Sequence, residues 1–425
     1  MSRNIFTLLA THVYGTNGCR CFGFTHFFTF CPMPLTQISL PDAQKIALYA
    51  QLLLPDANEP PLQASNPLTA VVQTLEHLGY VQIDTLSVVA RAHHHVLWTR
   101  LGNAYSETVL HELQATHKLI FEYWSHAASY LPMSHYRFTL PTKEHYAGGK
   151  SHWFEQDIRM KQYVLERIAA EGALQTKDFE KEPDKVGQSW YAWSAAKRAL
   201  EQLFMEGRLM VSRRKGFNKV YDLCERVLPN WVNTMPPTDE EYSEFLVKTA
   251  LRAHGIITLP DVCYLRPRLK NIVQQAINRL QNNGFILPVK VGNANQTAYT
   301  LPHMPDKALI TPATRHHPLV HLLSPFDNVV IQRKRLQQLF GFDYQIECYM
   351  PQNKRKYGYF SLPVLWNNQF IGRIDPKTDR KSGIFYIKNR FVEPNAPPMH
   401  KWQPALEQKL QAFAQFNGCN RVVYL

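Results

Sequence analysis

The stretch RLMVSRRKGFNKVYDL, residues 208–223, decides the fold class of this chain. Two strand-like runs meet at Lys215-Gly216, and this pattern predicts a β-hairpin. Residues 189–206 precede it and place Trp190, Trp193 and later apolar residues along one helical stripe. With a further helical pattern over 158–171, the order is helices followed by a hairpin. This is the order of a winged helix-turn-helix.

The same order occurs again further along the chain. Thr238-Asp-Glu-Glu241 is a capping box that predicts a helix to about His254, and residues 268–284 predict a second helix. FILPVKV and TAYTLP then predict the two strands of another hairpin. Towards the amino end, residues 39–54 and 69–78 predict helices, and a strand follows at 80–84. A repeated order is more specific than one occurrence.

The carboxyl-terminal part has a different pattern. DYQIECYM, YGYFSLPVLW, QFIGRID and GIFYIKN predict short strands, and residues 402–416 predict a closing helix. The fold class we expect is α+β, with tandem winged helix-turn-helix repeats and a C-terminal β-barrel-like module. The predicted regions are an extension of doubtful origin at 1–32, a first winged-helix region at 35–150, a second winged helix at 151–230, a third at 231–304, and the β-barrel-like module at 319–425.

Residues 1–32 differ from the rest of the chain. They hold three of the seven cysteines and six phenylalanines without a clear period. A signal peptide is an alternative, but no small-residue cleavage site follows cleanly. We expect these residues to be disordered and Met33 to be the natural start, which leaves 425 − 32 = 393 residues.

Charge and cysteine usage narrow the class of partner. The chain of 425 residues has a formal net charge of +13, which points to a polyanion, either nucleic acid or an anionic membrane surface. Neither a long apolar run nor a basic amphipathic helix is present, so we favour nucleic acid over membrane. Scattered, odd-numbered cysteines are typical of reduced thiols in the cytoplasm, where we place the protein, on the nucleoid.

Basic residues gather at the tips of the predicted hairpins. A hairpin tip is well placed to touch a phosphate backbone, although a basic turn can also serve solubility alone. We prefer DNA contact because helix-turn-helix patterns precede the hairpin. The candidates are Arg213, Arg214, Lys215, Lys219, Lys354, Arg355 and Lys356.

The stretch GYVQID, residues 79–84, carries the candidate chemistry. Side chains alternate along a strand, so Gln82 and Asp84 share one face while Val81 and Ile83 point into a core. An amide and a carboxylate side by side can hold a water molecule and draw a proton from it. The carboxylate can also stabilise positive charge on a sugar during cleavage of an N-glycosidic bond. The alternative is a polar pair that merely ends a strand, with Asp84 capping the turn at Thr85.

Cationic and polar residues follow this motif. His93, His94 and His95 are expected to line the same site, with Arg91 and Arg100 as phosphate contacts. At least one of the three histidines is expected to be a packed core residue. A triple-histidine metal site is disfavoured because adjacent residues on a strand point alternately up and down.

Three other carboxylates are candidates for a functional role. Glu122 with His126 suggests acid–base chemistry, and a structural polar contact is at least as good an interpretation. Asp327 and Asp375 lack a third acidic residue at a fitting spacing and are taken as structural.

From about Leu35 to the end, the chain resembles the interstrand-crosslink-repair DNA glycosylases of the tandem winged-helix family (YcaQ/AlkZ type). The resemblance rests on VQIDTLSVVARAHHHVLWTRLG, EYWSHAASYLP, KRALEQLFMEGRLMV, LLSPFDNVVIQRKR, KRKYGYFSLPVL and GRIDPK. It implies winged-helix repeats around a basic channel and excision of N7-alkylated guanines without a metal or cofactor. It also implies that Asp84 stabilises charge and activates water, and that Gln82 positions this water.

The expected function is therefore that of a monofunctional DNA glycosylase acting as a monomer on double-stranded DNA with alkylated or crosslinked guanine. The alternatives are a winged-helix transcriptional regulator without catalytic activity and a metal-dependent nuclease. No lysine lies close to the motif in sequence, so hydrolysis without lyase activity is predicted.

Overall fold

The predicted second winged helix is present in the computed structural model, which describes residues 35–54, 66–149, 155–179, 195–309 and 319–425. The helices α6 (Ile158–Glu171) and α7 (Ala195–Met205) precede the hairpin of β6 (Leu209–Lys215) and β7 (Asn218–Leu223). A short strand, β5 (Leu174–Gln175), completes a sheet of order β5-β7-β6. Trp190 and Trp193 lie outside the described residues.

A close approach explains the glycine after α7. Gly207 has φ of 76°, and a Cβ at this position would lie 2.7 Å from Cδ of Lys143. Glycine therefore allows the chain to turn from α7 into β6 against the Lys143 side chain.

The third region has the predicted elements and gains a strand from the amino end. The capping box of Thr238 and Glu241 is formed at the start of α9 (Asp239–His254). The later elements are α10 (Leu259–Val262), α11 (Lys270–Asn282), β8 (Ile256–Ile257), β9 (Leu287–Val291) and β10 (Ala298–Thr300). Their sheet has the order β1-β9-β10-β8, because β1 (Thr36–Ile38) pairs in parallel with β9.

The helix that follows β1 also packs on this third region. Ser39 caps α1 (Leu40–Ala50) as expected, with its side chain accepting from the Asp42 N–H. Ile46 and Ala47 of α1 share a buried cluster with Ile256 and Val289. The amino end of the predicted first region is thus built into the third.

The rest of the first region carries the motif with Gln82 and Asp84. Its helices are α2 (Pro67–Leu78), α3 (Ala92–Leu101), α4 (Glu107–Ala115) and α5 (Leu140–Ala147). Its strands, β2 (Val81–Gln82), β3 (Ile120–Trp124) and β4 (Ala128–Pro132), form a sheet of order β2-β4-β3. Val81 and Ile83 are buried, as predicted, in the main core cluster.

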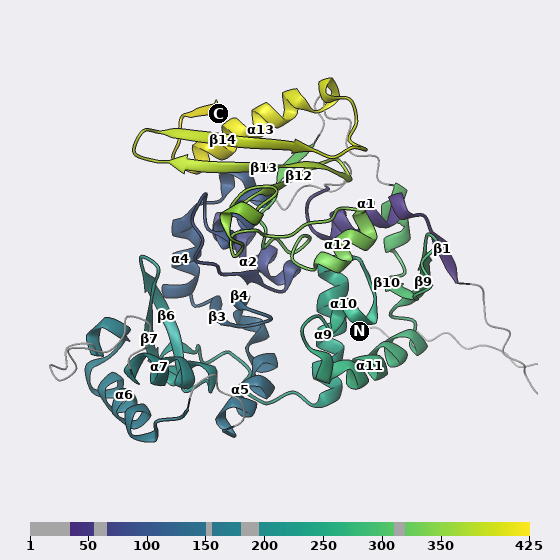
Figure 1. The fold of residues 1–425 in the computed structure, drawn as a ribbon. Coiled ribbons are helices and arrows are strands. Elements are labelled where there is room, and N and C mark those ends of the chain that lie inside the picture. Colours follow the sequence, from purple (N-terminus) through teal and green to yellow (C-terminus); the bar gives the residue numbers. More distant parts are fainter. Residues whose placement is uncertain (1–34, 55–65, 150–154, 180–194, 310–318) are drawn as a thin grey trace, which may run out of the picture. The chain divides into compact units, whose positions relative to one another are not determined.

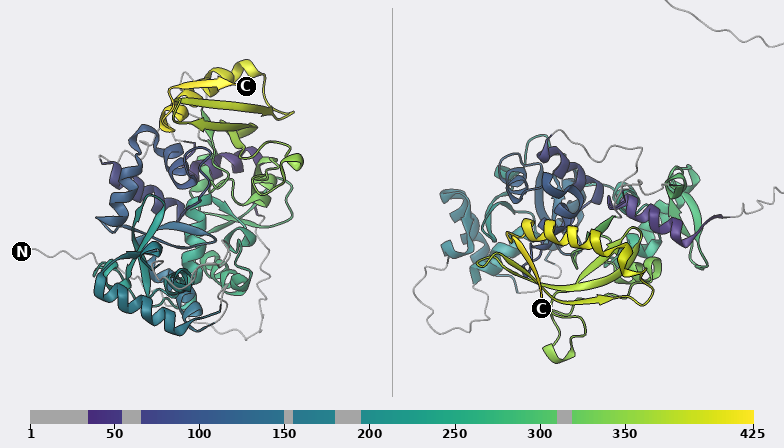
Figure 2. Two further views of the ribbon diagram at one scale, coloured as in Figure 1. Left: turned by 60° about the vertical axis from the view of Figure 1, so that its left-hand side comes forward. Right: turned by 90° about the horizontal axis from the view of Figure 1, so that it is seen from above.

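The C-terminal module is a curled, half-barrel sheet with a helix packed on it (Figures 1 and 2). Its strands are β11 (Val320–Leu322), β12 (Leu362–Trp366), β13 (Gln369–Asp379), β14 (Ile384–Val392) and β15 (Arg421–Tyr424), in that order. Two helices accompany them, α12 (Arg333–Phe340) and α13 (Gln403–Phe416). Phe413 and Leu410 of α13 are buried with Phe385 of the sheet.

One predicted strand of this module is wrong. DYQIECYM, residues 343–350, forms a loop with no ladder pairing. Its Glu347 carboxylate accepts the backbone N–H groups of Lys356, Tyr357 and Gly358, and the Tyr344 hydroxyl donates to the Ser361 carbonyl. Side-chain hydrogen bonds therefore hold this segment, and the apolar alternation comes from residues that face inward from a loop.

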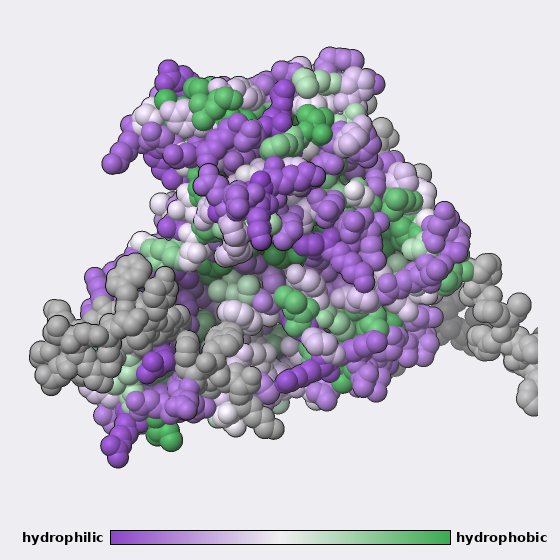
Figure 3. All heavy atoms as spheres, in the orientation of Figure 1, coloured by the Kyte–Doolittle hydropathy of each residue, from purple (hydrophilic) through white to green (hydrophobic). Residues whose placement is uncertain are grey.

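Residues Thr36–Leu425 form one compact unit whose buried residues fall into several clusters. The main cluster joins α2, α3 and α4 to the C-terminal sheet through Val96, Trp98, Phe360 and Phe413, among others. The face of the molecule shown in Figure 3 is mainly hydrophilic, with apolar side chains in scattered patches. None of the described helices is both long and apolar enough to cross a membrane.

Candidate active site

Strand β2 presents Gln82 at the edge of its sheet. Gln82 is opposite Ser129 of β4, and the Ile83 N–H continues the ladder by donating to the Ala128 carbonyl. The Gln82 side chain is 7% exposed, and its Oε1 lies 3.0 Å from Nε2 of His126. Burial lowers the pKa of His126 to about 4, so its ring is neutral at neutral pH and a single ring nitrogen carries a proton. Oε1 of the amide can only accept, which assigns that proton to Nε2.

Asp84 lies just beyond the end of β2 and is half-buried. Its Oδ1 accepts the Leu86 N–H at 2.8 Å, so Asp84 does cap the turn at Thr85. Within the described part of the chain, the carboxylate forms no ion pair with a lysine or arginine. Burial raises the pKa of Asp84 above its usual value, although backbone N–H groups of Leu86 and Thr85 act against this. Asp84 thus combines a structural cap with a negative charge that no nearby cation neutralises.

The loop at 343–350 brings two more side chains close to Asp84. Burial raises the pKa of the Cys348 thiol, and the Asp84 charge raises it further. Burial raises the pKa of Tyr349, and the negative charges of Cys348 and Asp84 raise it further. Tyr349 is 77% exposed. The C-terminal module therefore borders the candidate site, which no local sequence pattern indicated.

The three histidines lie on a helix, and the expectation of a strand is wrong. They occupy the first turn of α3, where His93 and His95 are buried. His95 Nε2 donates to the Leu322 carbonyl at 2.9 Å, which makes it the packed core histidine that was expected. His94 lies 2.6 Å from the Tyr105 hydroxyl, and burial lowers its pKa to about 3. His94 is therefore neutral despite the 3.5 Å distance to the Glu107 carboxylate.

Burial removes His93 and His95 from the candidate DNA contacts. The His93 ring packs between His94 and Tyr130, and only 3% of the residue is exposed. A side chain enclosed on all sides cannot reach a phosphate. Of the three, His94 is the most exposed, at 13% of its side chain.

Two predicted phosphate contacts, Arg100 and Arg214, instead pair with buried carboxylates, and a third, Lys219, pairs with a partly exposed one. Arg100 is 1% exposed and binds the Asp327 carboxylate through two hydrogen bonds of 2.7 and 2.9 Å. Arg214 binds Glu122 in the same bidentate way, at 2.6 and 2.7 Å. Lys219 lies 2.9 Å from Glu201. Arg100 and Arg214 therefore have structural roles in place of the expected DNA contacts, and Glu122 is the structural contact that its alternative interpretation described.

The remaining basic candidates keep access to solvent. Lys215, Lys354 and Lys356 are exposed, whereas Arg91, Arg213 and Arg355 are half-buried. The Arg91 guanidinium lies 4.5 Å from the centre of the Phe217 ring at the tip of the β6–β7 hairpin. Arg214 lies at the same distance from this ring. The hairpin tip is therefore held against the start of α3, close to the site.

The described residues offer no cluster of side chains suited to a metal ion. Among these, no group of three or more histidine, cysteine, aspartate or glutamate side chains comes together in a metal-binding arrangement. The Asp327 carboxylate forms the buried ion pair with Arg100, which agrees with the structural role expected from the sequence. Asp375 is buried in the C-terminal sheet at 4% exposure.

The winged-helix elements are typical of a DNA-binding class of protein. The family described as "DNA glycosylase AlkZ-like" matches residues 75–416, and the chain belongs to this family. It is a DNA glycosylase. Its fold is similar to that of a solved structure, Streptomyces sahachiroi DNA glycosylase AlkZ. This likeness has a TM-score of 0.58 at 16% identity and covers 92% of this chain and 100% of that chain.

Proposed function

We propose that the protein hydrolyses the N-glycosidic bond of N7-alkylated guanine in duplex DNA and unhooks guanine crosslinks, with Asp84 and Gln82 as its catalytic pair. The observation that carries this proposal is the half-buried Asp84 carboxylate, which has no ion-pair partner among the described residues and lies two residues from an amide whose orientation His126 fixes. Alkylation at N7 makes the base cationic, so the base can leave without a general acid.

The polarity of the Gln82 amide decides how it binds water. Since Oε1 accepts from His126, the amide NH₂ remains to donate a hydrogen bond to the water oxygen. Asp84 can only accept, and it takes a hydrogen bond from the water. The water is then held from opposite sides, with a lone pair left for the sugar carbon.

The reaction balances with these groups alone. The C1′–N9 bond breaks, and its electron pair neutralises the cationic base. Asp84 stabilises the positive charge that develops on the sugar. The water oxygen then bonds to C1′, its proton passes to Asp84, and the carboxyl group later returns this proton to solvent. The products are a free base and an abasic site.

The dependence on pH follows from Asp84. The reaction needs an ionised carboxylate, and burial raises its pKa above the ordinary value of 3.8. We therefore expect enzymatic base release to fall as the pH drops through a midpoint above 3.8, and to be fully present at neutral pH. Single-turnover rates at a series of pH values, corrected for spontaneous depurination, measure this fall in base release. A rate that stays flat down to the ordinary aspartate value would contradict the role of Asp84.

His126 is a positioning residue for Gln82. His126→Leu removes the donor to Oε1 and frees the amide to flip, so we expect kcat to fall roughly tenfold with little change in KM. His126→Gln keeps an N–H donor and should restore most of the loss. His117→Leu, at an exposed histidine, is the matched control. Equal losses in His126→Leu and His126→Gln, with lower thermal stability in both, would show a purely structural role.

The exposed lysines are the proposed phosphate contacts, and salt dependence tests them. We expect Lys215→Ala, Lys354→Ala and Lys356→Ala each to reduce the slope of log affinity against log salt by about 0.9 for duplex DNA. Lys219→Ala is the matched control, because its charge is already paired with Glu201. Fluorescence anisotropy at several salt concentrations gives the slopes. If Lys219→Ala changed the slope as much as the exposed lysines do, the assignment would be wrong.

A further inference from the structure

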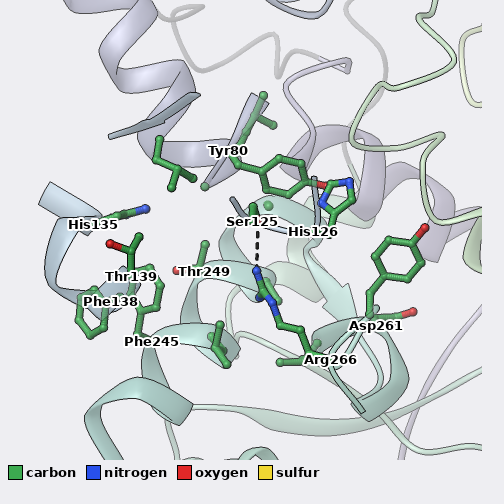
Figure 4. Close-up of a pocket in the computed structure, with 18 of the residues that line it drawn as sticks. Tyr80, Ser125, His126, His135, Phe138, Thr139, Phe245, Thr249, Asp261 and Arg266 are labelled. Carbon is green, nitrogen blue, oxygen red and sulfur yellow. Dashed lines mark hydrogen bonds between the residues drawn. The ribbon is translucent and has the colours of Figure 1, made fainter. Parts of the chain in front are cut away.

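A cavity of about 130 Å³ lies between the β2–β4–β3 region and α9, and Tyr80 and His126 are among the residues that line it. By the same measure a single water occupies roughly 10–15 Å³, so the cavity has room for a ring system of about ten heavy atoms. Figure 4 shows Tyr80 and His126 on one side and Arg266 reaching from the other side towards Ser125. The Arg266 Nη2 donates to the Ser125 hydroxyl at 3.1 Å.

His126 connects the wall of the cavity to Gln82 of the proposed catalytic pair. This side chain lines the cavity and also holds the Gln82 amide at 3.0 Å. Tyr80, which packs edge-on against His126 at 4.8 Å, lies two residues before Gln82, roughly 7 Å along the strand. The cavity therefore lies one side chain, that of His126, away from the Gln82 amide.

The walls favour an uncharged ring. Phe138 and Phe245 are stacked at 3.8 Å between centres, and Tyr80 and Tyr264 add two further aromatic rings. Among the described residues that line the cavity, Arg266 is the one charged side chain without an ion-pair partner. Asp261 is paired with Arg335 at 2.8 Å. The unbalanced positive charge of Arg266 disfavours a cationic occupant.

An unpartnered donor also points to a ligand. The Thr249 hydroxyl lines the cavity, and its oxygen is buried with no hydrogen-bond partner among the described residues. A buried hydroxyl without a partner costs free energy, which an acceptor on a bound group would recover. Thr249 and Arg266 together offer donors at two places in an otherwise aromatic cavity.

Building on the glycosylase function proposed above, we propose that this cavity receives an uncharged, ring-bearing substituent of the damaged guanine. The aromatic walls pack on its ring, and Arg266 and Thr249 donate to its oxygen acceptors. The substituent fills the cavity while the guanine itself remains next to the catalytic pair. The cavity would then set which bulky adducts are released efficiently.

The test compares two substituents on otherwise identical duplexes, N7-benzylguanine and N7-methylguanine. Ala250→Leu fills the cavity from α9, and we expect it to lower the benzyl-to-methyl ratio of kcat/KM by about tenfold or more. Ala170→Leu makes the same change at an exposed site on α6 and should leave this ratio at its parent value. Because Ala250→Leu can overpack α9, Arg266→Met is a second variant. It should raise the rate on an N7-(3-ammoniopropyl)guanine duplex relative to the benzyl duplex several-fold.

The outcomes separate this inference from the catalytic proposal. If the parent releases N7-methylguanine but the benzyl and methyl rates fall in parallel in Ala250→Leu, the cavity does not hold the substituent. An unchanged preference for the uncharged adduct in Arg266→Met would overturn the charge argument. If the parent releases neither base, the proposed function fails, and this inference fails with it.

Discussion

Asp84→Asn is expected to lower the single-turnover release of 7-methylguanine by about 100- to 1000-fold while duplex binding is retained. Asparagine keeps the oxygen that accepts the Leu86 N–H, so the turn after β2 is preserved. What is lost is the negative charge that no cation within the described residues neutralises. Because the substrate is a polyanion, removing this charge should leave DNA affinity equal or slightly higher.

The control for this variant is its binding. Fluorescence anisotropy on the same duplex shows whether Asp84→Asn still forms the complex, and the rate is then measured with the enzyme in excess. A variant that binds and releases the base at the parent rate would remove Asp84 from the mechanism. A variant that neither binds nor melts cooperatively would be uninformative about chemistry, and Asp84→Glu then provides the comparison, with its charge retained and its position shifted.

The second large effect is on stability and concerns the Arg100–Asp327 pair. Asp327→Ala should lower the free energy of unfolding by roughly 3–5 kcal/mol, because it leaves the Arg100 guanidinium buried without a counter-charge. Arg100 also donates to the carbonyl and side-chain oxygen of Gln51, so the pair ties α3 to the end of α1 and to the loop before α12. Chemical denaturation measures the change.

Two further variants test whether the loss of stability in Asp327→Ala comes from the unpaired Arg100. Glu171→Ala breaks an exposed pair with Arg167 and should change stability little. Replacing both partners of the buried pair, as Arg100→Met with Asp327→Leu, should cost less than the sum of the single changes. If Asp327→Ala were as mild as Glu171→Ala, the buried pair would not hold these elements together.

The local elements were predictable because their signals are local. The capping box at Thr238, the helix stop at Gly79 and the hairpin at residues 208–223 each depend on residues a few positions apart. The same reasoning failed at residues 343–350, where apolar alternation predicted a strand. There the long-range bonds of Glu347 and Tyr344 decide the conformation, and a periodic pattern carries no information on them.

The candidate site was predictable in part. Gln82 and Asp84 stand out as polar residues in an apolar run, and His126 was recognised as a candidate but assigned to Glu122 as its partner. In the structure, His126 forms a hydrogen bond with Gln82, and Glu122 pairs with Arg214, 92 residues away. Arg100 likewise finds Asp327 at a separation of 227 residues. The sequence shows that a basic residue is present, but it does not show the residue's ion-pair partner. That partner decides whether the basic side chain faces DNA or the core.

The most direct test of the central claim is the release of free base from a duplex with one N7-methylguanine, followed by chromatography with and without EDTA. We predict 7-methylguanine at equal rates in both conditions, with the DNA strand intact until the abasic site is cleaved by hot alkali. The absence of released base, or release only when a metal ion is present, would contradict hydrolysis by Asp84 and the water held at Gln82.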